Sequence, residues 1–113
     1  MNRLGVEAER LASAHLEAAG LRLLTRNYQC RLGEIDLVCA EGETLVFVEV
    51  RQRRSEAFGG AAASITARKR RRLVGAARHY LMCLGRLPAC RFDVVLVTGR
   101  QPRIEWLRSA FEA

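Results

Sequence analysis

The sequence has 113 residues, of which 50% are hydrophobic and 27% charged, so it predicts one globular domain spanning residues 1–113. No apolar run is long enough to cross a bilayer, and the acid-containing N-terminus argues against a signal peptide. We therefore expect a cytoplasmic protein without membrane contacts. The 19 basic and 12 acidic residues give a net charge of +7, which favours a polyanion-binding protein.

The predicted elements begin with a helix over residues 3–19. Its apolar stripe has helical spacing, and Gly20 is expected to end it. Strands follow at 22–30 and 34–40, and residues Glu41 to Glu43 form a hairpin turn. The next strand, 44–51, is the strongest in the chain because it is rich in β-branched residues.

A loop over residues 55–63 separates these strands from a helix predicted at about 65–84, with Ser64 as N-cap. A continuous apolar strand at 91–98 and an edge strand at 103–108 complete the order α-β-β-β-α-β-β. This order predicts an α/β fold with a mixed sheet flanked by helices.

Histidines and cysteines give no zinc pattern. The four cysteines, Cys30, Cys39, Cys83 and Cys90, contain no C-x-x-C pair, so reduced core thiols are expected. We expect His15 to be packed in the first helix and His79 to lie at the surface.

Two acids carry the strongest chemical signal. Asp36 lies inside an apolar strand, and Glu49 lies near the end of the next one. A carboxylate in such a strand is costly unless it is paired, hydrogen-bonded or bound to metal. If the two strands form a hairpin, Asp36 comes beside Glu49, and the pair is suited to Mg²⁺ or Mn²⁺. Arg51 shares a strand face with Glu49, where it could stabilise phosphodiester charge.

Basic residues concentrate between Arg51 and Arg72, with Glu56 as the only acid among them. Aromatic residues are nearly absent from this stretch, so phosphate contact is a better prediction than base stacking. The candidate nucleic-acid contacts are Arg53, Arg54, Arg68, Arg70, Arg71 and Arg72.

The spacing of Asp36 and Glu49-Val50-Arg51 resembles the PD-(D/E)XK nuclease signature. The segments Gly33-Glu34-Ile35-Asp36-Leu37, Val46-Phe47-Val48-Glu49-Val50-Arg51 and Arg91-Phe92-Asp93-Val94-Val95 resemble the signature blocks of the YraN-like family. So do Gly5…Ala8-Glu9…Ala12 and Arg26-Asn27-Tyr28, so the resemblance covers nearly the whole chain. It implies a restriction-endonuclease-like fold, similar to archaeal Holliday-junction resolvases. It also implies that Glu9, from the first helix, assists the metal site.

The chain departs from the nuclease pattern at Arg51, where that pattern has lysine. Arginine stays charged and can only stabilise negative charge, whereas lysine can lose its proton. Lys69 is the only lysine of the chain and lies on the inward stripe of the second helix. We hypothesise that Lys69 takes the missing role; the alternative is a phosphate contact or a solvated side chain.

Three functions remain open. The first is a Mg²⁺- or Mn²⁺-dependent endonuclease acting on structured or branched DNA, with Asp36, Glu49 and the Val50 carbonyl as ligands and a homodimer as a plausible state. The second is a nucleic-acid-binding module without turnover. The third is an interaction subunit of an RNA–protein assembly. In the structural alternative, Asp36 and Glu49 belong to an ion-pair network with Arg51 and Arg53, and Arg91 pairs with Asp93.

Overall fold

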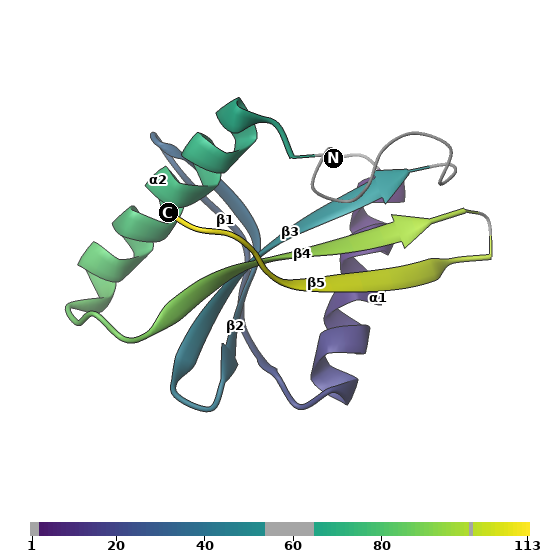
Figure 1. Ribbon diagram of the computed structural model, residues 1–113, viewed down its shortest axis with the longest axis horizontal. Coiled ribbons are helices and arrows are strands. Elements are labelled where there is room, and N and C mark those ends of the chain that lie inside the picture. The colour runs from purple at the N-terminus through teal and green to yellow at the C-terminus, as the bar shows by residue number, and fades with distance from the viewer. Residues whose placement is uncertain (1–2, 54–64, 100) are drawn as a thin grey trace.

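The computed structural model describes residues 3–53, 65–99 and 101–113. Its elements follow the predicted order (Figure 1). They are α1 (Arg3–Ala18), β1 (Arg22–Cys30), β2 (Gly33–Glu41), β3 (Thr44–Arg53), α2 (Ala67–Leu84), β4 (Cys90–Thr98) and β5 (Arg103–Phe111). The last strand continues beyond its predicted end at residue 108, and neither described helix is long and apolar enough to cross a membrane.

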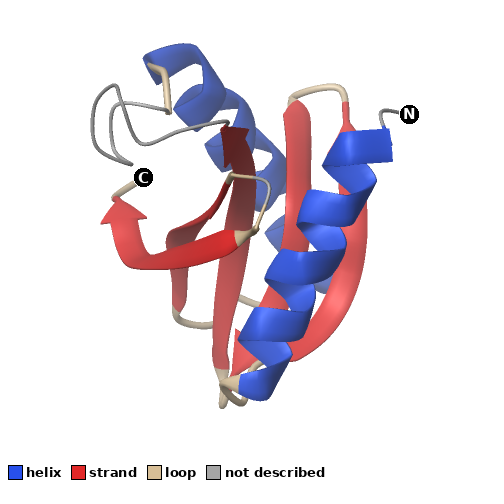
Figure 2. Ribbon diagram, turned by 90° about the vertical axis from the view of Figure 1, so that its right-hand side faces the viewer, coloured by secondary structure: helices blue, strands red, loops and turns tan. Residues whose placement is uncertain are grey.

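The strands form one five-stranded sheet in the order β1-β2-β3-β4-β5. Neighbouring strands are antiparallel except β3 and β4, which are parallel. A parallel pair needs a crossover connection, and α2 lies in that connection. The predicted mixed sheet flanked by helices is confirmed, with α1 and α2 on opposite faces (Figure 2).

Each face of the sheet packs against one helix. On the first face, Ala8, Ala12 and Leu16 of α1 pack against a cluster that includes Val46 and Val48 of β3. On the other face, α2 packs against a cluster that includes Leu45 and Phe47 of the same strand. The buried residues of α2 are Leu73, Ala76 and Ala77. Side chains alternate along β3, so a single strand supplies both cores.

The two described helices begin and end close to their predicted positions, except at the N-terminus of α2. Gly20, with φ of +102°, follows α1 as expected. The predicted N-cap at Ser64 is wrong: α2 begins at Ala67, and the Thr66 hydroxyl accepts a hydrogen bond from the Lys69 backbone N–H at 3.1 Å. Ile65 precedes the helix and is buried against β4 residues instead of joining the α2 stripe.

Three predictions about the burial of histidines and cysteines are wrong. His15 is exposed, with its ring edge-on to Trp106, because α1 turns Ala12 and Leu16 toward the sheet. His79 is half-buried and hydrogen-bonds the Tyr28 hydroxyl. All four cysteines are free as expected, but only Cys39 is buried, whereas Cys83 and Cys90 are exposed.

Candidate functional site

Asp36 and Glu49 lie where the ladder between β2 and β3 ends. That ladder runs from Glu41 opposite Thr44 to Leu37 opposite Val48, so the two acids come directly after its last pair. Beyond this point the strands diverge (Figure 1). Asp36 Oδ2 accepts a hydrogen bond from the Val50 backbone N–H at 2.8 Å. The carboxylate therefore satisfies a backbone donor where strand pairing has stopped.

The two carboxyl groups interact strongly. Burial, the adjacent Asp36 charge and a hydrogen bond with Asp36 together raise the pKa of Glu49 to about 8. Burial also raises the pKa of Asp36, while the bond from Val50 and the bond with Glu49 oppose that rise. Two half-buried carboxyl groups in contact cannot both be charged cheaply, so they share a proton unless a bound cation compensates the second charge.

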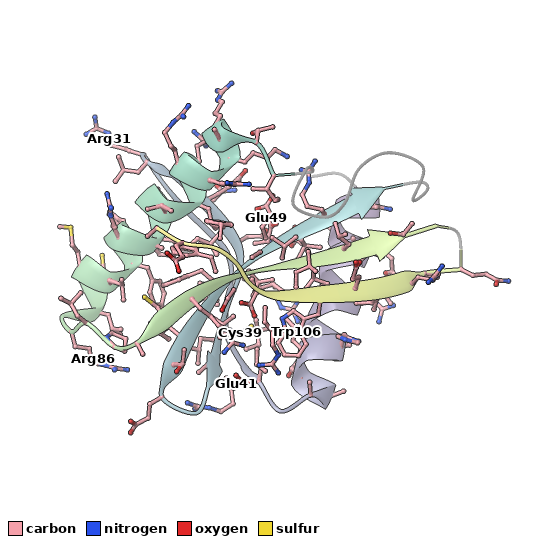
Figure 3. The ribbon with its side chains drawn as sticks, viewed as in Figure 1. Arg31, Cys39, Glu41, Glu49, Arg86 and Trp106 are labelled. Carbon is pink, nitrogen blue, oxygen red and sulfur yellow. The ribbon has the colours of Figure 1, made fainter. Side chains whose placement is uncertain are left out.

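Two cations face this pair. Arg51 Nη1 lies 4.0 Å from Glu49 Oε1, and the charges of both Arg51 and Lys69 favour ionised Glu49. Lys69 also lowers the pKa of Asp36. Figure 3 shows Glu49 between β3 and the end of α2 that carries Lys69. The structure therefore brings the only lysine of the chain near both acids, as the inward stripe of α2 predicts.

Glu9 approaches the same region from α1. It is half-buried, and burial followed by the Asp36 charge raises its pKa, whereas a side-chain hydrogen bond with Asn27 lowers it. Asn27 has φ of +52°, a left-handed conformation that asparagine tolerates better than most residues. The sequence pattern assigned Asn27 no role beyond its place in a family segment. An asparagine inside a predicted strand was the one sequence feature that could have indicated it.

The candidate phosphate contacts differ in exposure. Arg68, Arg71 and Arg72 are exposed on α2, consistent with a basic surface. Arg70 is half-buried instead, with its guanidinium 5.5 Å from the centre of the Phe111 ring. Arg53 ends β3, and Arg54 lies outside the described residues. Arg68, Arg71 and Arg72 are therefore the best-placed residues of this set for contacts with a polyanion.

The position of α2 depends on glycine at 33. A Cβ atom built on Gly33 would lie 2.0 Å from the Arg72 carbonyl oxygen and 2.8 Å from Arg72 Cα. Only glycine allows the start of β2 to come this close to the α2 backbone. The approach fixes α2 beside the strand that carries Asp36, which explains why the two elements place Lys69 near the acids.

Asp93 belongs to a separate network on the opposite, α1-facing side of the sheet. It is completely buried and accepts hydrogen bonds from Arg91 Nε, Trp106 Nε1 and the Ser109 N–H, at 3.0, 2.9 and 2.9 Å. Arg91 also bonds Glu41. The expected pairing of Arg91 with Asp93 is confirmed. The hydrogen bonds from Trp106 and Ser109 to Asp93 join β5 to β4. The network therefore has a structural role in holding the edge strand.

The donor set around Asp36 and Glu49 has the chemistry of a hard-cation site. Carboxylate oxygens are the ligands that Mg²⁺ and Mn²⁺ prefer, and a cation between the two groups would remove the cost of ionising both. The described residues contain no group of three or more histidine, cysteine, aspartate or glutamate side chains arranged to hold a metal. Further ligands would therefore have to come from backbone carbonyls, water or substrate oxygens.

Comparison with known proteins places the chain in a family. The model of the uncharacterised protein family UPF0102 matches residues 8–97. A UPF0102 protein of Nitrosospira multiformis is 56% identical over 96% of this chain and 92% of its own length. A UPF0102 protein of Cupriavidus taiwanensis is 59% identical over 96% of this chain and 82% of its own length. A UPF0102 protein of Methylobacillus flagellatus is 52% identical over the full length of both chains. The match covers β1, β2, β3, α2 and all of β4 but its last residue, with the acid pair inside it, and the chain belongs to the family UPF0102.

Proposed function

We propose that this protein is a Mg²⁺- or Mn²⁺-dependent endonuclease with a restriction-endonuclease-like fold, acting on structured or branched DNA in the cytoplasm. The observation that carries the proposal is the contact between the Asp36 and Glu49 carboxyl groups at the end of the β2–β3 ladder, facing Lys69 and Arg51. Half-buried convergent carboxyl groups with raised pKa values beside basic side chains are typical of sites that bind metal and phosphate.

Asp36 and Glu49 would hold the ion. The Val50 carbonyl is a further candidate, because the N–H and C=O of one strand residue point to the same side, and the Val50 N–H points at Asp36. A bound divalent ion would lower the pKa of a coordinated water and neutralise phosphate charge. The residues fit this ion, since burial and the adjacent Asp36 carboxyl raise the pKa of Glu49, and a cation held between the two groups would offset both effects.

The other site residues would act on the phosphodiester directly. Hydrolysis joins a water oxygen to phosphorus, breaks the bond to one ester oxygen and delivers a proton to that oxygen. Arg51 would stabilise charge on the non-bridging oxygens, because its guanidinium cannot release a proton. Lys69 would donate hydrogen bonds to phosphate or to the attacking water. Glu9, whose pKa is raised by burial, would accept a proton from that water.

The exposed arginines of α2 extend this site into a DNA-binding surface. Arg68, Arg71 and Arg72 lie on the helix that carries Lys69, so phosphates neighbouring the scissile one could contact them. Contacts of this kind orient a duplex without reading its sequence. Cutting two strands of a branched substrate requires two sites, and a homodimer would supply them.

The test is a cleavage assay on four-way junctions, nicked and linear duplexes, single-stranded DNA and RNA with Mg²⁺, Mn²⁺ or EDTA. Asp36→Asn and Glu49→Gln keep the size of each side chain and remove its charge, so both should abolish cutting by the folded protein. Glu43→Gln, which changes an exposed acid in the turn of the same hairpin, is the matched control and should cut like wild type. Metal-independent cutting, or cutting that survives both site variants, would refute the proposal.

A second candidate is a DNA- or RNA-binding module without turnover, favoured by one observation. Arg51 occupies the lysine position of the nuclease pattern and already lies 4.0 Å from Glu49, as a structural ion pair would. This candidate predicts binding that is unaffected by metal and by Glu49→Gln. Arg51→Lys separates the two functions, because it should preserve or increase turnover in a nuclease and create none in a binding module.

A further inference from the structure

The C-terminal end of α2 carries an apolar groove far from the acid pair. Arg78, Leu81, Met82, Gly85, Arg86 and Leu87 line this α2 groove, whose volume is about 480 Å³. Met82 is 79% exposed and Leu87 is 87% exposed, so two large apolar side chains project into water. Lys69 and the groove lie roughly 20 Å apart along the helix. Figure 3 shows Glu49 and Arg86 near opposite ends of α2.

A second hollow also borders α2. Arg31, Leu32 and His79 line it, with a volume of about 470 Å³, and His79 follows Arg78 directly in α2. Leu32 is 58% exposed and packs against the helix at Gly75. Exposed apolar side chains therefore lie along α2 from Gly75 to its C-terminal end, namely Leu32, Met82 and Leu87. Surface leucines are ordinary when scattered, but apolar residues gathered along one helix in this way mark an interaction site.

The charge around both hollows is of one sign. Arg31, Arg78 and Arg86 line them, and none of the three forms an ion pair within the described part of the chain. A symmetric second copy would place Arg78 and Arg86 against the same residues of its partner, which costs free energy. Nucleic acid gains little from aliphatic walls, because bases stack on aromatic side chains.

We propose that the α2 groove binds an acidic segment of a partner protein, with aliphatic or aromatic side chains seated on Met82 and Leu87 and neighbouring carboxylates paired with Arg78 and Arg86. Apolar anchors in a groove supply most of the affinity in such complexes, and surrounding charges supply specificity and association rate. The groove would hold the protein to its partner while the distant acid pair stays accessible. The inference does not depend on the proposed nuclease activity.

The experiment selects displayed random peptides of twelve residues against the intact protein and measures the affinity of the enriched sequences by fluorescence anisotropy. Peptides with leucine, phenylalanine or tryptophan beside aspartate or glutamate should be enriched. Met82→Asp and Leu87→Asp should each weaken their binding at least tenfold, and Arg78→Glu with Arg86→Glu should weaken it similarly. The four substituted side chains, Met82, Leu87, Arg78 and Arg86, all line the groove. All four are exposed, so the variants should fold.

Leu24→Asp is the matched control, because Leu24 is 42% exposed and lies in β1, outside the groove. It should bind the peptides like wild type, and so should Asp36→Asn, which keeps this result separate from that of the nuclease assay. Four results would overturn the proposal: no shared acidic and apolar pattern among selected peptides, binding that survives Met82→Asp, a dimer in sedimentation that Met82→Asp dissociates, or binding to phosphatidylglycerol vesicles that the same variant abolishes.

Discussion

Gly33 and Arg72 approach each other so closely that the first residue of β2 has no room for a side chain. A Cβ atom on Gly33 would lie 2.0 Å from the Arg72 carbonyl oxygen, well inside van der Waals contact. Backbone atoms of a helix cannot move aside individually, so any substitution must push α2 away from the sheet. The contact joins the segment preceding Asp36 to the helix that carries Lys69 and the exposed arginines.

Gly33→Ala should therefore lower the free energy of unfolding by roughly 3 kcal/mol, because the added methyl group overpacks a backbone contact. Gly75→Ala is the comparison: its new Cβ would lie 3.0 Å from Leu32 Cβ and 3.3 Å from the Leu32 carbonyl oxygen, a looser approach than that at Gly33, and alanine favours the helix. Its unfolding free energy should stay within about 1 kcal/mol of wild type. Urea denaturation of both variants checks this, and equal losses would contradict the assigned role of Gly33.

Stability should depend on pH through Glu49. Its pKa is about 8 in the folded protein and near its ordinary value of 4.5 when unfolded. Between these values the folded state binds more protons than the unfolded state, so this group lowers stability as pH rises from about 4.5 to 8. Glu49→Gln removes that dependence and should stabilise the metal-free protein at pH 8 by about 1–2 kcal/mol. Thermal unfolding of wild type and Glu49→Gln in EDTA at pH 5 and pH 8 measures this stabilisation. A larger stabilisation at pH 5 than at pH 8 would contradict the prediction.

Mn²⁺ affinity should rise with pH over the same range. The ion requires ionised carboxylates, so binding must displace the proton that Glu49 holds. Between pH 6 and pH 7 the association constant should increase up to about tenfold, the limit for release of one proton. Calorimetric titration in two buffers of different ionisation enthalpy reports the proton released. Glu49→Gln should lose the affinity, whereas Glu43→Gln should keep it; pH-independent affinity in wild type would contradict the shared-proton description.

The Asp93 network should contribute strongly to stability and little to the site. Asp93→Ala removes a buried charge from Arg91 and leaves the Trp106 and Ser109 donors unpaired, so it should cost about 3–5 kcal/mol. Glu41→Ala removes the partly exposed end of the same network, where solvent screens the ion pairs, and should cost much less than Asp93→Ala. Chemical denaturation compares them. A similar cost for both would show that Asp93 is not the centre of the network.

Salt dependence should identify the DNA-facing arginines. Arg68→Gln, Arg71→Gln and Arg72→Gln should each weaken duplex binding, and each lost phosphate contact should reduce the slope of log K against log salt by roughly one. Arg10→Gln is the control, because Arg10 is exposed on α1 and paired with Glu7. Fluorescence anisotropy in EDTA measures binding without cleavage. Unchanged slopes for all three α2 variants would place the DNA elsewhere.

Local patterns predicted much of this molecule, and long-range contacts account for what they missed. The strand alternation and short turn were enough to place Asp36 beside Glu49. Ser64 and Thr66 are equally good caps in isolation, and burial of Ile65 against β4 goes with the later start of α2. The exposure of His15 depends on which helix rotation buries Leu16 best. The approach of Gly33 to Arg72 joins elements distant in sequence, so no local pattern could reveal it.

The hydrogen bond from Val50 to Asp36 gives the two acids unequal freedom to vary. Asp36 accepts the Val50 backbone N–H, so a homologue without catalytic activity would still need an acceptor at this position. Among the described residues no backbone N–H is seen to donate to Glu49, and partial burial beside Asp36 makes ionisation of Glu49 costly, as its raised pKa indicates. Loss of turnover within a lineage should therefore appear first as a neutral residue at position 49, with the acceptor at position 36 retained.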